Sequence, residues 1–250
     1  MREINLYNEF HLGDNIFTTH YLNKYVGENI QFNYYVHNTY IDELTKHIKN
    51  DKIILKPLDY HNLPNDSFNM WIGHNHFFFN VISSHNFMFD KFYVDFYKMV
   101  SNTLNIENKI LTNSDMLIDN SNYKISLDKS FDYLIINSVP HSAQFNFQDS
   151  DFTHLCEYLA NNNFSFITTR KIRDYECTLD YGMSIVDIGN LSNYCNNIIA
   201  INTSPIITTF TKENIDKKKL MLVLDNHLSY SYHENIFHIT NFSDIYNKIN

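Results

Sequence analysis

The sequence predicts an α/β protein built from two Rossmann-like domains that face each other across a cleft. Three observations lead to this prediction. The chain has 250 residues, of which 44% are hydrophobic, so it can bury a large core. Short apolar runs alternate with segments of helical periodicity, which is typical of βα units. A polar, weakly periodic stretch at 107–130 is followed by the same rhythm again, so we expect domains at 1–115 and 116–250.

In the first domain, four short apolar runs are predicted as strands and three periodic segments as helices. The periodicity is clearest after the first strand, where Phe17, Tyr21, Leu22 and Tyr25 share one helical face. Pro57 marks the end of the third strand. The predicted strands are 4–7, 30–36, 52–58 and 68–73, and the predicted helices are 16–26, 40–49 and 87–104.

In the second domain the pattern predicts four strands and four helices. Phe152, Leu155, Cys156 and Leu159 follow the i, i+3, i+4, i+7 spacing of a helix that buries one face. The predicted strands are 133–137, 165–168, 197–201 and 219–224, and the predicted helices are 151–159, 185–194, 206–211 and 244–249. Both domains therefore show an alternation of strands and helices, which is typical of parallel sheets.

Charge and cysteine content exclude several classes of protein. The chain carries 19 Lys and Arg against 28 Asp and Glu, a net charge of -9, so no general binding to nucleic acid is expected. No apolar run approaches the roughly 18 residues of a membrane span, and the N-terminus lacks the apolar core of a signal peptide. Cys156, Cys177 and Cys195 fit neither a disulfide framework nor a zinc site. We expect a cytoplasmic protein.

A first candidate site follows the first strand, in the sequence HLGDN at 11–15. In open α/β sheets ligands bind at the carboxyl ends of the strands, where helix N-termini present free N–H groups. A carboxylate at this point, Asp14, can serve as a base. The structural alternative is that Asp14 only caps the helix that follows, a common use of Asp.

A second candidate site follows the strand at 197–201. Asn202, Thr203, Ser204 and Pro205 form a predicted turn that opens a helix, and such a turn can hold phosphate through hydroxyl groups and backbone N–H groups. Three cations at 170–173 follow the strand at 165–168 and can neutralise a diphosphate if both strands share one sheet. The alternatives are a Ser/Thr cap with proline in the first turn, and a solvated charged loop.

Other patterns carry less weight. Asp149 and Asp151 have the D-x-D form of a metal-bound nucleotide site, but they open a predicted helix, so capping explains them better. His74, His76 and His85 lack a completing ligand for zinc. The sequence has no dinucleotide fingerprint, P-loop or nucleophile-elbow motif. We therefore expect neither a metal nor a cofactor.

Two segments together resemble the lipopolysaccharide heptosyltransferase family of glycosyltransferases, which have the GT-B fold. They are FHLGDNIFTTHYLNKYV near the start and SIVDIGNLSNYCNNIIAINTSPIITTF near the end. The resemblance implies that Asp14 deprotonates the acceptor hydroxyl and that the late turn holds the donor diphosphate. It also implies a basic residue early in the second domain, a role that His141 or Arg170 can take. The resulting donor-binding candidates are Gly13, Asn15, Ser138, His141, Arg170, Lys171, Asn202, Thr203, Ser204 and Pro205.

The expected function is therefore an inverting, metal-independent glycosyltransferase. It would move a sugar from a nucleotide-diphosphate donor, which is a substrate and not a cofactor, to a hydroxyl group of a glycan or another acceptor. Two alternatives remain open. One is a non-catalytic module of the same fold that binds a nucleotide sugar or a glycan, and the other is a fucosyltransferase-like GT-B enzyme.

Overall fold

The computed structural model describes most of the chain and divides it into two compact units. The described residues are 1–27, 29–72, 89–107, 112–120, 125–139, 148–217, 219–223 and 235–249. Unit 1 comprises Met1–Leu117 and unit 2 comprises Ile118–Asn250. Each unit has its own parallel β-sheet, which is the arrangement that the alternating pattern of the sequence predicts.

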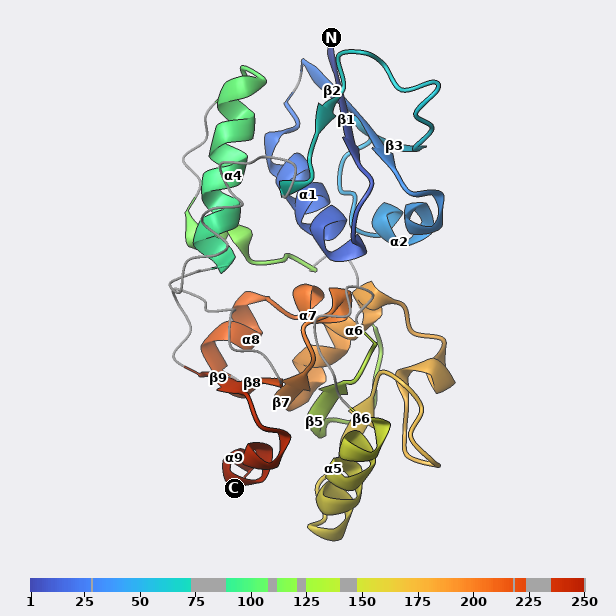
Figure 1. The fold of residues 1–250 in the computed structure, drawn as a ribbon, viewed down its shortest axis with the longest axis vertical. Coiled ribbons are helices and arrows are strands. Elements are labelled where there is room, and N and C mark those ends of the chain that lie inside the picture. The colour runs from blue at the N-terminus through green and yellow to red at the C-terminus, as the bar shows by residue number, and fades with distance from the viewer. Residues whose placement is uncertain are drawn as a thin grey trace. The chain divides into compact units, whose positions relative to one another are not determined.

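Unit 1 contains a four-stranded parallel sheet with the order β3-β2-β1-β4 (Figure 1). The strands are β1 (Arg2–Asn8), β2 (Ile30–Val36), β3 (Ile53–Pro57) and β4 (Phe68–Asn69). The helices are α1 (Leu12–Tyr25), α2 (Ile41–Thr45) and α4 (Phe89–Thr103), with short 3₁₀ turns η1 (Asn38–Tyr40) and η3 (Asn113–Met116). The chain runs from β1 outward to β2 and β3 and then returns to the other side of β1. The strand order therefore reverses between β1 and β4.

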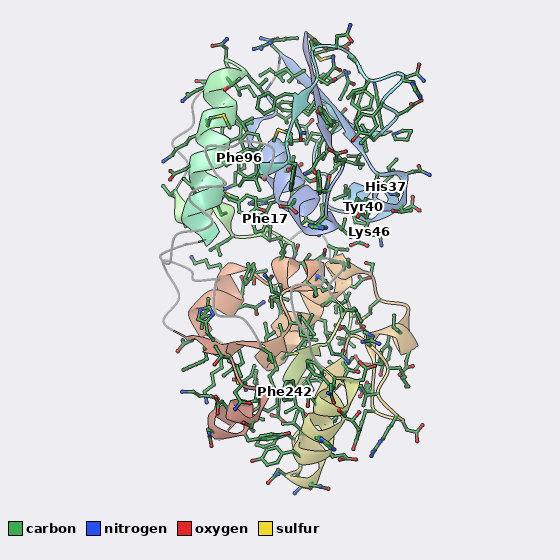
Figure 2. All side chains as sticks on the ribbon, in the orientation of Figure 1. Phe17, His37, Tyr40, Lys46, Phe96 and Phe242 are labelled. Carbon is green, nitrogen blue, oxygen red and sulfur yellow. The ribbon has the colours of Figure 1, made fainter. Side chains whose placement is uncertain are left out.

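Aromatic packing joins α1 to α4, which lie side by side in Figure 1. Tyr21 of α1 stacks on Tyr97 of α4, with ring centroids 4.3 Å apart. Phe17 of α1 stacks on Tyr93 of α4 at 4.4 Å, and Figure 2 shows Phe17 on the side of α1 that faces α4. Stacked aromatic pairs contribute beyond their buried area, so these contacts fix α4 against the first helix.

Unit 2 contains a five-stranded parallel sheet with the order β6-β5-β7-β8-β9. The strands are β5 (Phe131–Ile136), β6 (Phe166–Thr168), β7 (Cys195–Ala200), β8 (Lys219–Val223) and β9 (Ile236–Ile239). The helices are α5 (Asp149–Asn161), α6 (Ile185–Leu191), α7 (Ser204–Thr208), α8 (Lys212–Lys217) and α9 (Tyr246–Ile249), with 3₁₀ turns η4 (Thr178–Tyr181), η5 (Ser192–Tyr194) and η6 (Phe242–Ile245). This is the flavodoxin-like strand order, and it reverses between β5 and β7.

One hydrophobic cluster of unit 2 lies between its sheet and the helices α5 and α9. Alternate residues of β5, Tyr133 and Ile135, point into this cluster, as the period of two along a strand requires. Phe242 of η6 packs edge-on against Phe152 of α5, with centroids 5.0 Å apart, and Figure 2 labels Phe242 in this region. All three cysteines are buried, and none of them forms a disulfide.

The structure corrects several expected elements. Helix α1 begins at Leu12 instead of residue 16, so the predicted Gly turn is the first helical turn. The predicted helix at 206–211 is α7, only five residues long, and it begins earlier, at Ser204. Neither β9 nor α8 was expected from the sequence. Among the described residues, none of the helices is both long and apolar enough to cross a bilayer.

Candidate functional site

The first candidate site lies where α1 follows β1. Asp14 is the third residue of α1, and His11 is the N-cap residue. Asp14 is therefore not the helix cap that the structural alternative proposed. β1 pairs with β2 on one side and with β4 on the other, and in open α/β sheets the crevice beside such a reversal of strand order is the usual place for a ligand. The fold thus positions this carboxylate at the edge of the sheet where ligands usually bind in open α/β folds.

The Asp14 carboxylate accepts hydrogen bonds from the Tyr93 hydroxyl and from its own backbone N–H, and it lies near the titratable ring of His11. The Tyr93 hydroxyl donates a hydrogen bond of 2.7 Å to Oδ1, and Nδ1 of His11 lies 3.8 Å from Oδ2. Burial raises the pKa of the Asp14 carboxyl above its ordinary value, whereas the Tyr93 hydrogen bond, the nearby His11 ring and the backbone N–H of Asp14 lower it. A carboxylate with a raised pKa is a stronger base near neutral pH. Its side chain is still 20% exposed, so a substrate can reach it.

Asn15 stabilises the turn between β1 and α1. Its Nδ2 donates to the carbonyl oxygens of Phe10 and His11 at 3.1 and 2.9 Å. Its Oδ1 accepts a hydrogen bond of 2.6 Å from the Tyr34 hydroxyl. Asn15 is fully buried, and Gly13 beside it is buried in the same helical turn. Both residues therefore shape the backbone that carries Asp14.

The second candidate site lies at the carboxyl ends of β5, β6 and β7. These three strands are neighbours in the sheet of unit 2, as the sequence interpretation required. Ser138 follows β5, Arg170 and Lys171 follow β6, and the 202–205 turn follows β7. Ligands in flavodoxin-like sheets bind beside the reversal of strand order, which here falls between β5 and β7. His141 lies outside the described residues, as do His74, His76 and His85.

Asn137, which the sequence analysis missed, ties two of these strand ends together. Its Oδ1 accepts hydrogen bonds from the backbone N–H groups of Thr169 and Arg170, at 3.2 and 2.8 Å. Its Nδ2 donates to the carbonyl oxygen of Arg170 at 3.3 Å. The hydroxyl groups of Ser138 and Thr169 lie 3.1 Å apart. An Asn directly after a buried strand is the sequence signal that could have identified this residue.

The predicted cations are each paired with a carboxylate. Arg170 Nη1 lies 3.2 Å from Oδ1 of Asp149, and Lys171 Nζ lies 2.6 Å from Oδ2 of Asp180. The Asp180 contact raises the pKa of Lys171, and the Lys171 contact lowers the pKa of Asp180. Arg173, in turn, pairs with Glu157. The loop after β6 therefore carries cations whose present partners are surface carboxylates.

The turn after β7 is open to solvent in part. Asn202, Thr203 and Ser204 are half-buried, whereas Pro205 is buried within α7. Thr203 is the N-cap residue of α7, and Pro205 lies in its first turn, where a missing N–H group has no cost. Within the described part of unit 2, this turn shares no side-chain hydrogen bond with Arg170 or Lys171. The structure thus brings the two segments to one sheet edge without joining them.

The D-x-D residues have structural partners. Asp149 pairs with Arg170, and Oδ2 of Asp151 accepts a hydrogen bond from the backbone N–H of Gln148 at the start of α5, at 3.3 Å. No cluster of three or more His, Cys, Asp or Glu side chains that could hold a metal ion occurs among the described residues. The two carboxylates thus take part in an ion pair and a helix cap.

No protein-family model matches this sequence, and no curated protein sequence matches it. Solved structures do match. E. coli heptosyltransferase WaaC with ADP aligns over 99% of this chain and 99% of its own, with a TM-score of 0.59 at 8% identity. WaaC with ADP-2-deoxy-2-fluoro heptose gives the same coverage and identity with a TM-score of 0.57.

A further match is the dodecameric, iron-containing heptosyltransferase TibC in complex with ADP-D-beta-D-heptose. It aligns over 94% of this chain and 62% of its own, with a TM-score of 0.50 at 9% identity. These structural neighbours are heptosyltransferases, which are glycosyltransferases, so the family resemblance expected from the sequence is confirmed at the level of the fold. This chain has an α/β fold with parallel sheets that resembles the GT-B heptosyltransferases.

Proposed function

We propose that this chain is an inverting, metal-independent glycosyltransferase that moves a sugar from a nucleotide-diphosphate donor to a hydroxyl group of a glycan or another acceptor. The observation that carries the proposal is the position of Asp14, a partly buried carboxylate at the carboxyl edge of a parallel sheet. Burial makes this carboxylate more basic. The similarity to heptosyltransferase structures supports it at the level of the fold.

In the proposed reaction, Asp14 accepts the proton of the acceptor hydroxyl. The hydroxyl oxygen then forms the new bond to the anomeric carbon of the donor sugar, while the bond from that carbon to the diphosphate oxygen breaks. Attack opposite the leaving group inverts the configuration at the anomeric carbon. The nucleoside diphosphate leaves with the bonding electron pair, and its added charge requires cations or oriented N–H groups.

We assign the donor diphosphate to unit 2, beside the point where its strand order reverses. The 202–205 turn and Ser138 would contact the phosphate oxygens, and Arg170, Lys171 and His141 would supply positive charge. Exposed ion pairs contribute little to stability, so Arg170 and Lys171 can exchange Asp149 and Asp180 for phosphate at little cost. Gly13 and Asn15 would act through the backbone of the Asp14 turn. The proposal requires the acceptor-side domain and the donor domain to meet across a cleft that excludes water during transfer.

A binding screen followed by a transfer assay tests this function. A ligand that binds only the native protein raises its melting temperature, so ADP-, UDP-, GDP-, CMP- and dTDP-linked sugars are compared by thermal shift. An ADP-linked sugar is the first choice, because the two WaaC structures contain ADP or ADP-2-deoxy-2-fluoro heptose. A preference for a GDP-linked sugar would favour the fucosyltransferase-like alternative.

The donor that binds is then used to compare the wild type with Asp14→Asn. This change keeps the size of the side chain but removes the basic carboxylate, so donor affinity should be retained while transfer slows by roughly a hundredfold or more. Asp59→Asn is the matched control, since Asp59 is an exposed carboxylate of the same unit. Transfer by Asp14→Asn at the wild-type rate would reject Asp14 as the base, and donor binding without turnover by the wild type would favour the binding module.

A further inference from the structure

The two oxygens of the Asp14 carboxylate have different surroundings. Oδ1 accepts the 2.7 Å hydrogen bond from the Tyr93 hydroxyl. Oδ2 faces Nδ1 of His11 at 3.8 Å, which is too long for a hydrogen bond. The His11 side chain is 52% exposed and the Asp14 side chain is 20% exposed. Among the described side chains, the partner of Oδ1 is therefore a buried hydroxyl group, and the neighbour of Oδ2 is an exposed ring.

Tyr93 is well fixed for holding the carboxylate. It lies on α4, 79 residues along the chain from Asp14, and its side chain is only 4% exposed. Its ring stacks on Phe17, one turn after Asp14 on α1, with centroids 4.4 Å apart and planes 24° apart. Because the ring is buried and stacked, its hydroxyl has little freedom to move away from Oδ1.

We propose that Tyr93 is a positioning residue for the base: it holds Oδ1 so that Oδ2 faces the acceptor hydroxyl, and it keeps the buried carboxylate ionised. This inference rests on the proposed function, and it identifies the residue that controls the charge state of Asp14. In the described structure, Tyr93 is the side chain that donates a hydrogen bond to this carboxylate.

The ionisation argument follows from the groups that surround Asp14. Burial raises the pKa of its carboxyl, and Tyr93, His11 and, to a lesser extent, the backbone N–H of Asp14 oppose that rise. Two other hydroxyl groups nearby, those of Tyr34 on β2 and Tyr97 on α4, stay protonated, because burial and the Asp14 charge both raise their pKa. Without Tyr93, the pKa of Asp14 should rise further. At a given pH more of the carboxyl would then carry a proton and be unable to act as a base.

Tyr93→Phe tests this inference, with Tyr21→Phe as the matched control. Tyr21 is also buried and stacked, and its hydroxyl lies 2.9 Å from that of Ser101 and does not bond Asp14. The Asp14 carboxyl is titrated by ¹³C NMR in protein labelled at aspartate, and its signal is assigned by its loss in Asp14→Asn. This measurement needs no substrate. The pH dependence of transfer is measured in parallel.

We expect Tyr93→Phe to raise the pKa of Asp14 and to move the acidic limb of the kcat/KM profile to higher pH by the same amount. At neutral pH kcat should fall roughly tenfold or more while the donor KM is unchanged, and Tyr21→Phe should change neither. An unchanged Asp14 titration, or a shifted titration with a wild-type pH profile, overturns the inference. A shifted titration in a protein whose wild type transfers no sugar rejects the proposed function instead.

Discussion

Phe10 and Trp71 stack face to face, with ring centroids 3.6 Å apart and planes 16° apart. Phe10 lies two residues after Asn8, the last residue of β1, and Trp71 lies two residues after Asn69, the last residue of the neighbouring strand β4. Oδ1 of Asn8, at the end of β1, accepts from the N–H of Phe10 at 3.0 Å, and Oδ1 of Asn69, at the end of β4, accepts from the N–H of Trp71 at 2.8 Å. The stack therefore ties the turn that leads to Asp14 to the neighbouring strand end.

Removing one ring of this stack should change the fluorescence of the other. Trp71 is the single tryptophan of the chain, so its emission reports on this edge of the sheet. Phe10→Ala should shift the emission maximum to longer wavelength, because the indole gains contact with water, and it should lower the free energy of unfolding by about 1 kcal/mol or more. Tyr60→Ala, a change at an exposed ring of the same unit, should leave the emission unchanged. Wild-type emission from Phe10→Ala would contradict the stack.

We predict that adding a Cβ at Gly189 of α6 disturbs the packing of α6 against α7. A Cβ at this position would lie 2.7 Å from the carbonyl oxygen of Thr208 in α7 and 2.7 Å from Nδ2 of Asn120. Gly189→Ala should therefore separate α6 from α7 and lower the free energy of unfolding by about 1–3 kcal/mol in urea titrations. Because α7 begins at Ser204, donor binding should weaken as well.

Gly27→Ala is the control for this change. Its Cβ would meet no atom within 4 Å, so stability should stay within about 1 kcal/mol of the wild type. Equal stability of both alanine variants would show that α6 and α7 do not approach as closely as the structure describes.

The sequence predicted a strand at each of β1 to β8 and missed β9. β2 and β5 are buried along most of their length, so their hydrophobic pattern is strong. β9 has only four residues at the edge of the sheet, with His238 exposed, and such a pattern is too weak to recognise. Helix α1 was placed too late because Gly13 was interpreted as a turn, although its backbone is helical.

In the candidate site, too, the features that depend on neighbouring residues in the sequence could be predicted, and the contacts between distant residues could not. The position of Asp14 after a strand follows from the local pattern, and so does the order of the segments after β5, β6 and β7. The hydroxyl of Tyr93 reaches Asp14 from another helix, and the carboxylate of Asp149 reaches Arg170 across 21 residues. Contacts of this kind depend on how helices pack on the sheet, which one sequence does not reveal.

We expect unit 1 to become less stable in acid, because protonation of Asp115 removes a stabilising contribution of its carboxylate. Burial alone would raise the pKa of its carboxyl, but hydrogen bonds from Thr112 and Lys24 outweigh that effect and lower the pKa to about 2. The unfolded value is near 3.9, so the ionised carboxylate stabilises the fold above that pH, and this contribution is lost as the pH falls toward 2. Asp115→Ala should cost about 1 kcal/mol at pH 7, as expected for a helix cap.

The difference between Asp115→Ala and the wild type should be nearly the same in urea titrations at pH 7 and pH 5 and should become smaller at pH 3. The exposed Asp51 provides the control substitution, Asp51→Ala. A stability difference that does not change between pH 7 and 3 would show that the lost contacts of Asp115 do not depend on its charge.

Ser204→Glu should weaken donor binding strongly, because it places a bulky anion at the turn proposed to hold the diphosphate. Calorimetry with the donor identified by thermal shift should show a loss of at least roughly tenfold in affinity, with the fold unchanged by circular dichroism. Ser243→Glu is a matched control, since Ser243 is also at the start of a short helical turn, after β9, which lies two strands from β7. Wild-type affinity in a folded Ser204→Glu protein would place the diphosphate elsewhere.

Transfer should survive removal of divalent metal. A D-x-D pair that holds a metal must keep the oxygens of both carboxylates available, but Asp151 accepts the backbone N–H of Gln148 at the start of α5. The leaving diphosphate would then be stabilised by Arg170, Lys171 and backbone N–H groups. Enzyme treated with EDTA should keep most of its activity, and Asp151→Ala should lower the free energy of unfolding by about 1 kcal/mol through loss of the cap while transfer continues. Complete loss of activity in EDTA, with recovery on adding Mg²⁺ or Mn²⁺, would instead make these two carboxylates candidate metal ligands.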